Sequence, residues 1–256
     1  MIHFGLMDLS SALPLVAILS IGIFVQAAAG FAAGLLIIPC MLWFGYSIPE
    51  AQTSLLVATI PQNLWGVWSF RDCIEVRRVA WPGFARVVFL PLGLWLLHNL
   101  ETVSPVTLRQ IVGVFVLSAT AATIGFRPIP RSSVHPGWAW LAFPLSGFLQ
   151  GLVGMGGPAM VFWVQAHDWD TRRSRGFLFS MYLISIIPAL TILYLFFGSR
   201  IIGPGLAAAA MIPWLVWITT LGLRLGTRLG QGRLRRITLA LLFLLGLSGL
   251  ASPWLQ

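Results

Sequence analysis

Long apolar segments, separated by short polar connections, recur along the whole chain. Most of them approach the roughly 20 residues that an α-helix needs to cross the hydrocarbon core of a bilayer. The pattern predicts helices over residues 9–29, 34–45, 49–70, 79–98, 106–125, 137–153, 158–166, 176–197, 203–223 and 236–253. The chain is therefore predicted to be an all-α polytopic membrane protein.

Two of these segments, 34–45 and 158–166, are too short to span a membrane. Each follows a glycine-rich break, Gly30-Phe-Ala-Ala-Gly34 in one case and Gly154-Met-Gly-Gly-Pro158 in the other. A short apolar helix after such a break indicates a re-entrant hairpin, or a crossing helix that is broken near the middle of the membrane. We therefore expect hairpins over 9–45 and 137–166.

The composition supports membrane insertion. Hydrophobic residues make up 58% of the 256 residues and charged residues only 9%, with a mean hydropathy of +0.89. A soluble domain would have no interior large enough for that apolar excess. The start of the chain lacks the basic region and small-residue cleavage site of a signal peptide, so the segment from Leu9 is expected to be a mature first helix.

The charge distribution predicts the orientation in the membrane. All 16 basic residues are arginine, and the net charge is +9. The arginines lie mostly in short connections, which is typical of cytoplasmic loops and argues against a nucleic-acid partner. Arginine-rich loops are predicted at 71–78, 126–136, 167–175 and 224–235. With these loops cytoplasmic, both termini are expected outside.

This topology makes the two halves inverted. The first half is a hairpin entering from outside followed by three crossings, and the second half is a hairpin entering from inside followed by three crossings. A weak sequence match supports the division, since Gln26-x3-Gly30 aligns with Gln150-x3-Gly154. We expect a first inverted repeat over 1–126, a cytoplasmic linker over 127–136 and a second repeat over 137–256. Transporters often have inverted repeats with interrupted helices, and bind substrate near the midplane where the repeats meet.

The paired glycine-rich hairpins resemble those of the TauE/SafE sulfite-exporter family of anion permeases. The residues that carry this resemblance are Gly30 to Gly34 leading to Pro39, Gly147 to Gly157 leading to Pro158, and Pro49-Glu-Ala-Gln-Thr-Ser54. The chain departs from the family pattern at Ala32 and Ala33, where glycine is usual, and at Arg172-Arg-Ser-Arg175. The resemblance implies movement of sulfite, a sulfonate or a similar small anion across the cytoplasmic membrane of a bacterium.

An anion site between the two hairpin tips is also expected on physical grounds. A helix that starts at a break inside the membrane points free N–H groups and the positive end of its dipole into the site. The neutral amides of Gln26 and Gln150 lie one turn before the breaks. A fully buried arginine is expected to hold the anion too tightly, so the site is predicted to use neutral donors. The candidate residues are Gln26, Gly30, Ala32, Ala33, Gly34, Gln150, Gly154, Gly156, Gly157, Pro158 and Ala159.

Other polar groups inside the apolar segments have two interpretations. Arg86 is expected either to reach the cytoplasmic interface by snorkelling or to guide an anion into an inner vestibule. The remaining polar residues are expected either to join helices or to line a permeation site. They are Thr53, Ser54, Gln62, Asn63, Ser146, Ser180 and Ser185.

Several functions are disfavoured. No acidic residue falls in the middle of a span, so a carboxylate relay is not expected, and the Cys and His spacings predict no metal site or cofactor. No grouping of residues suits a membrane-embedded enzyme. The alternatives to a permease are an anion channel and a non-transporting assembly subunit. The expected partners are a small anionic substrate and the lipid bilayer.

Overall fold

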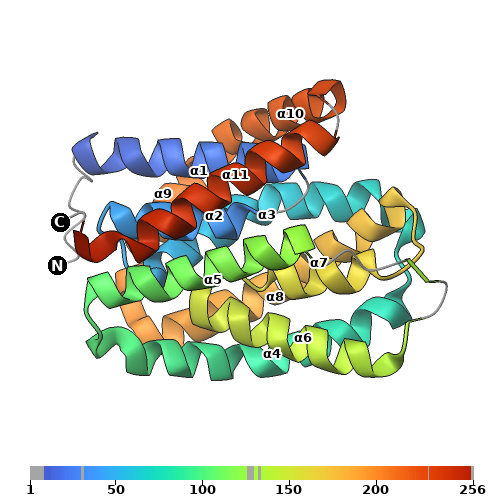
Figure 1. Ribbon diagram of the computed structural model, residues 1–256, viewed down its shortest axis with the longest axis horizontal. Coiled ribbons are helices and arrows are strands. Elements are labelled where there is room, and N and C mark those ends of the chain that lie inside the picture. Colours follow the sequence, from blue (N-terminus) through green and yellow to red (C-terminus); the bar gives the residue numbers. More distant parts are fainter. Residues whose placement is uncertain (1–8, 30–31, 126–129, 132–133, 230, 255–256) are drawn as a thin grey trace.

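The computed structural model describes residues 9–29, 32–125, 130–131, 134–229 and 231–254 (Figure 1). Within these residues the regular structure is helical, apart from one isolated bridge between Arg131 and His167. The α-helices are α1 Leu9–Ala29, α2 Ala33–Trp43, α3 Ile48–Ser69, α4 Val76–Asn99, α5 Pro105–Gly125, α6 Pro136–Val153, α7 Gly157–Gln165, α8 Thr171–Phe197, α9 Ile202–Ala210, α10 Ile212–Leu229 and α11 Gln231–Leu250. The prediction of an all-α protein is confirmed.

Two predicted boundaries are wrong. The segment 203–223 is not one helix, because α9 ends at Ala210 and α10 begins at Ile212, with a proline in its first turn. The arginine-rich stretches 167–175 and 224–235 are largely helical, since α8 begins at Thr171 and α10 and α11 cover all of 224–235 except residue 230. The Asp170 carboxylate accepts a hydrogen bond from the Arg173 N–H at 2.9 Å. This cap lets α8 begin earlier than predicted.

The chain is an integral membrane protein. In the described part of the chain, three helical stretches are long and apolar enough to cross a bilayer, namely Val76–Asn99, Pro105–Gly125 and the continuous run Thr171–Ala210. Large apolar side chains on the outside of the bundle are exposed, which suits contact with lipid. Examples from four different helices are Trp65, Trp95, Trp140 and Ile187.

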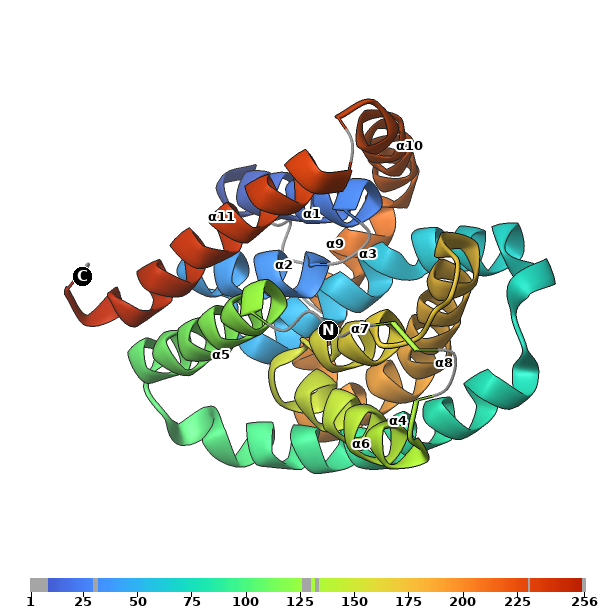
Figure 2. The ribbon, with the colours of Figure 1, turned by 45° about the vertical axis from the view of Figure 1, so that its right-hand side comes forward.

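Each predicted hairpin is present. Helix α2 folds back along α1, and α7 folds back along α6. The first hairpin begins and ends at one end of the bundle, and the second begins and ends at the other (Figure 1). Near the centre, α2 and α7 lie between α1 and α11 on one side and α4 and α6 on the other (Figure 2).

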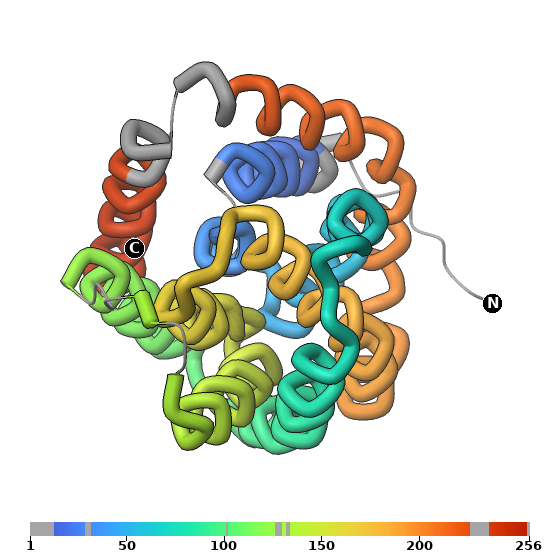
Figure 3. The backbone as a smooth tube through the Cα atoms, turned by 90° about the vertical axis from the view of Figure 1, so that its right-hand side faces the viewer, coloured from blue at the N-terminus to red at the C-terminus, as the bar shows by residue number. Residues whose placement is uncertain are grey.

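The packing of the helices is reciprocal between the halves. Helix α6 packs on α4 as α1 packs on α10, while α3 packs on α8 and α5 on α11. Viewed end-on, α2 is enclosed within the bundle (Figure 3). Exchanging the halves therefore preserves the pairings, as expected for related repeats. The exact repeat limits, 1–126 and 137–256, stay a prediction.

The arginine-rich connections gather at one end of the bundle. The α3–α4, α7–α8 and α10–α11 junctions and the start of α6 lie together there (Figure 1). The α2–α3, α4–α5 and α8–α9 connections, the start of α1 and the end of α11 lie at the opposite end. We call the first of these the arginine-rich end.

Candidate functional site

The first hairpin tip turns at a strained residue. Ala32 has φ +91°, and it is the one non-glycine residue with positive φ in the described part of the chain. This left-handed conformation costs a residue with a Cβ roughly 1–2 kcal/mol. Helix α2 begins directly afterwards at Ala33. The turn has the geometry of a glycine break although alanine occupies it.

The second tip is built from glycines that leave no room for a side chain. Gly154 ends α6 in the left-handed region at φ +71°, and its N–H donates to the Gln150 carbonyl at 3.0 Å. A Cβ on Gly156 would lie 2.2 Å from the Ser146 carbonyl oxygen. The Ser146 hydroxyl in turn donates to the Gly156 carbonyl at 2.7 Å. These contacts hold the turn against α6.

The two tips are in direct contact. A Cβ on Gly34 would lie 3.0 Å from the Gly154 carbonyl oxygen and 3.8 Å from Met155 Cα. The first residues of α2 therefore face the loop that starts α7. Two short helices thus direct their N-termini, with their unpaired N–H groups, toward one region inside the bundle.

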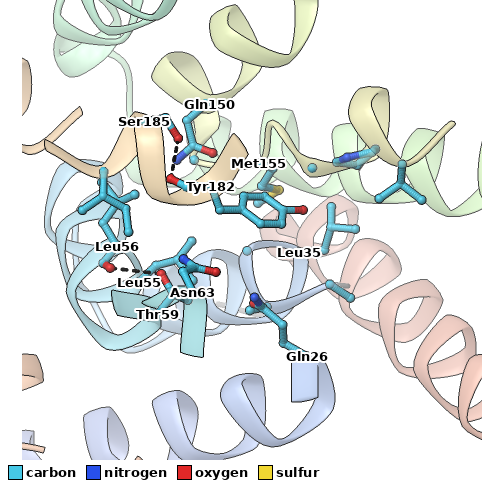
Figure 4. Close-up of a pocket in the computed structure, with 18 of the residues that line it drawn as sticks. Gln26, Leu35, Leu55, Leu56, Thr59, Asn63, Gln150, Met155, Tyr182 and Ser185 are labelled. Atoms are coloured by element: carbon cyan, nitrogen blue, oxygen red, sulfur yellow. Dashed lines mark hydrogen bonds between the residues drawn. The ribbon is translucent and has the colours of Figure 1, made fainter. Parts of the chain in front are cut away.

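A cavity of about 70 Å³ lies between the tips (Figure 4). Its walls come from both hairpins and from α3, α4, α5 and α8. The lining residues are Gln26, Ala32, Ala33, Gly34, Leu35, Leu55, Leu56, Thr59, Asn63, Arg86, Thr123, Gln150, Gly154, Met155, Gly157, Pro158, Val161, Phe162, Tyr182, Ser185 and Ile186. By the same measure one water molecule needs about 10–15 Å³, so the cavity has room for a few waters or one small ion.

Most of the predicted site residues lie around this cavity. Two of the described ones do not contribute to its lining. Gly156 is buried in the second tip beside it, Ala159 lines a separate, larger cavity on the other side of α7, and Gly30 is outside the described residues. The residues that the structure brings together are Gln26, Ala32, Ala33, Gly34, Gln150, Gly154, Gly157 and Pro158.

Arg86 does not reach the membrane interface, so the snorkelling interpretation is wrong. Its side chain is 1% exposed and faces the cavity from α4. Gly147 makes this placement possible, because a Cβ there would lie 2.0 Å from the Arg86 carbonyl oxygen. The close approach of α4 and α6 brings the guanidinium over α6, where Nη2 donates to the Gln150 amide oxygen at 3.1 Å.

The other contacts of the Arg86 guanidinium are weak. Nη1 meets the Met160 sulfur, and the guanidinium carbon lies 5.5 Å from the centre of the Tyr182 ring. Nε is buried without a hydrogen-bond partner. One donor of a buried cation is therefore unsatisfied, which is costly in an apolar interior.

Among the described residues, no carboxylate forms an ion pair with Arg86. The ion pairs found in the described part of the chain include Arg71–Asp72, Arg78–Glu75, Arg173–Glu75 and Arg200–Glu50, all at helix ends or connections. An unpaired charge at membrane depth is expensive, and residues of this kind generally mark a pathway for ions or substrates. The cavity therefore contains a buried cation beside the neutral groups that were predicted for the anion site.

The sequence did not single out every side chain of the cavity. Tyr182 had no role assigned, and Thr59 on α3 was likewise missed. Asn63 and Ser185 were recognised as polar groups inside apolar segments, and both line the cavity. Ser185 bonds back to its own helix through the Met181 carbonyl at 3.1 Å, whereas the Asn63 amide oxygen is buried without a partner. An amide in the middle of an apolar helix was the available signal.

A bundle of apolar helices in which two broken hairpins enclose a cationic cavity defines a polytopic membrane transporter. The family model for "Sulfite exporter TauE/SafE" matches residues 14–249, nearly the whole chain. The chain belongs to this family, as its glycine-rich hairpins indicated. No curated protein and no solved structure matches it.

Proposed function

We propose that this protein is a permease that moves a small sulfur-containing or organic oxyanion across the membrane, with the binding site between the two hairpin tips. The observation that carries the proposal is Arg86, a fully buried cation beside a small cavity, with no carboxylate partner among the described residues. A bound anion would neutralise this charge. Sulfite and small sulfonates suit the family and the size of the cavity.

The donors around the cavity can hold an oxyanion from several directions. The Gln150 amide oxygen accepts from Arg86 Nη2 and from the Gly156 N–H at 3.4 Å, which leaves its NH2 group as the end that can meet a ligand. The first N–H groups of α2 and α7 have no partner within their own helix and supply further donors, except at Pro158, which has no N–H. Three oxygens of a sulfite or sulfonate could thus each find a partner.

Release is as necessary as binding. Arg86 already donates to Gln150, and its charge is shared with the Tyr182 ring. An anion therefore competes with existing contacts rather than meeting a bare cation. This arrangement limits the net affinity and keeps the exchange reversible.

Reconstitution in proteoliposomes tests the proposal. We expect saturable flux of radiolabelled sulfite or methanesulfonate in the wild type, and loss of at least tenfold in Arg86→Met. Arg109→Met is the matched control, since Arg109 also lies on a membrane helix but bonds the Leu42 carbonyl at 3.1 Å and stacks on Trp43, away from the cavity. Wild-type flux in Arg86→Met, at equal protein incorporation, would place the site elsewhere.

The same experiment separates the alternatives. A carrier shows a maximal rate and acceleration by substrate on the opposite side, whereas a channel shows flux that rises with concentration without counterflow. An assembly subunit shows no flux. The proposal fails if the reconstituted protein moves none of the anions tested.

We further propose that the protein resides in a bacterial inner membrane with its arginine-rich end in the cytoplasm. The α3–α4, α7–α8 and α10–α11 junctions and the start of α6 lie at that end, and the start of α1 and the end of α11 lie at the other. This asymmetry agrees with the bias of arginine toward cytoplasmic loops.

A further inference from the structure

A second cavity lies between the central site and the arginine-rich end. Its volume is about 110 Å³, and its walls come from α1, α3, α8 and α10. Gln26 and Tyr182 line both this cavity and the central one. We call it the vestibule. These two side chains therefore lie where the two spaces adjoin.

The vestibule continues one face of α3 beyond the central site. On α3, Thr59 and Asn63 line the central cavity, while Gln62, Gly66 and Ser69 line the vestibule. Residues three or four apart lie on the same helix face. The face that meets the central cavity therefore runs on as the wall of the vestibule.

Helix α8 supplies the opposite wall by the same spacing. Ser185 lines the central cavity, Tyr182 lines both, and Phe179 and Arg175 line the vestibule. The seven residues from Arg175 to Tyr182 correspond to about 10 Å along a helix. Arg175 thus lies at the outer end of the vestibule, in the second turn of α8.

Gln62 and Arg175 are two polar side chains that line the vestibule. The Gln62 amide oxygen is buried without a partner, in a side chain only 6% exposed. Arg175 is half-buried and makes none of the ion pairs found among the described residues, in contrast to Arg173, which pairs with Glu75. An amide can present its NH2 group instead of its oxygen after rotation. Together these groups offer a cation and an amide donor to an anion.

We propose that the vestibule is a second anion subsite, held by Arg175 and Gln62, from which the substrate passes Tyr182 and Gln26 to reach Arg86. This inference rests on the function proposed above and adds the route from the arginine-rich end. Arg175 concentrates the anion by its charge. The Tyr182 ring, which also contacts the Arg86 guanidinium, separates the two subsites.

The experiment measures KM separately from each side of oriented proteoliposomes. The chain has two cysteines, Cys40 in α2 and Cys73 in the α3–α4 connection at the arginine-rich end. In a Cys40→Ala background, labelling of Cys73 with a membrane-impermeant maleimide reports the orientation. Radiolabelled sulfite is the probe, at low and high ionic strength.

Arg175→Gln is expected to raise KM about three- to tenfold for sulfite added at the arginine-rich end, with little change in maximal rate or in KM from the other end. High salt should reduce the difference from wild type. Gln62→Met is expected to raise KM from the same end without lowering thermal stability, because it removes an unpartnered buried polar group. A merely structural role for either residue would not produce a KM effect confined to one side.

Arg172→Gln is the matched control, since Arg172 is exposed one turn earlier on α8 and its loss removes the same charge from the same end. Equal KM changes in Arg172→Gln and Arg175→Gln would show a general surface-charge effect and overturn the subsite. Unchanged KM in both Arg175→Gln and Gln62→Met would also overturn it. If Arg86→Met then remains inactive, the central site stands without the vestibule. Wild-type flux in Arg86→Met would place the central site elsewhere, and absence of flux in the wild type would refute the proposed function.

Discussion

Replacing Arg86 by methionine should leave the substrate-free protein as stable as the wild type, or more stable, while it abolishes the response to substrate. The guanidinium is buried without a carboxylate partner among the described residues, and Nε lacks a hydrogen bond. Methionine is a flexible, unbranched side chain that can fill much of the same space. The substitution removes the charge and keeps most of the packing.

The magnitude follows from the contacts that the arginine makes. Its bond to Gln150 contributes about 1.5–3 kcal/mol and the Tyr182 ring up to about 2 kcal/mol. Transfer of the charge from water costs several kcal/mol, so these terms roughly cancel. The Gln150 oxygen is not orphaned by the substitution, because the Gly156 N–H still donates to it. We expect a gain of between zero and about 2 kcal/mol, or a rise of up to about 6 °C in Tm.

The assay is thermal unfolding of purified protein, with and without sulfite. A ligand at a hundred times its Kd stabilises the folded state by about 2.7 kcal/mol, so the wild-type Tm should rise with sulfite. The Tm of Arg86→Met should not. Arg109→Met should keep the ligand response, because Arg109 lies outside the cavity. If Arg86→Met unfolds several degrees lower and still responds to sulfite, Arg86 is a structural residue and the reasoning fails.

Four further outcomes are expected. Gln150→Ala should weaken transport about tenfold, which is the effect of losing one donor worth ~1.4 kcal/mol. Gly156→Val should weaken transport more, because the valine side chain would overlap the backbone of α6. Wild-type flux in both variants would contradict this prediction. Ala32→Gly should relieve the strain of the left-handed conformation. After the entropy cost of glycine is subtracted, the net stabilisation should be about 0.5–1 kcal/mol, measured as a small rise in Tm. An unchanged or lower Tm would show that the turn is not strained. Cys73 should be protected from an impermeant maleimide in intact cells and react after permeabilisation, and labelling of intact cells would reverse the assigned orientation. Burial, aided by nearby arginines, lowers the pKa of His167 in the connection before α8. The unfolded chain therefore takes up a proton at this histidine first, and the stability of the fold should decrease as pH drops below about 6.5. The Tm of His167→Asn should be less sensitive to pH over this range.

The sequence alone predicted the class of protein and most of its helices. In a bilayer every backbone N–H and C=O group must be satisfied within the segment, so a long apolar stretch has little choice but to form a helix. The two glycine-rich breaks also followed from local composition, since short helices after such breaks cannot span. These features depend on neighbouring residues in the chain, and neighbouring residues can be read from the sequence.

The wrong helix boundaries were set by signals that hydropathy does not report. Helix α8 begins early because Asp170 caps it, and the run 203–223 breaks at Met211 although it is apolar throughout. Hydropathy measures the affinity of a segment for lipid and does not indicate where a helix is interrupted. The arginines of 224–235 were assigned to a loop, but helical backbone can carry them at the membrane surface.

The site was only partly predictable because its side chains come from helices that are far apart in the sequence. The sequence determined that both tips are glycine-rich and carry a glutamine one turn earlier, and the structure places both glutamines on one cavity. Only the tertiary structure decided whether the Arg86 side chain lies at the membrane interface or inside the bundle. At its depth in α4 an arginine can reach the interface or turn inward, and the absence of a side chain at Gly147 on α6 allows the inward position. Tyr182 and Asn63 join the cavity because α3 and α8 pack across the two halves, and the face that a helix turns to the centre is set by its neighbours rather than by its own sequence.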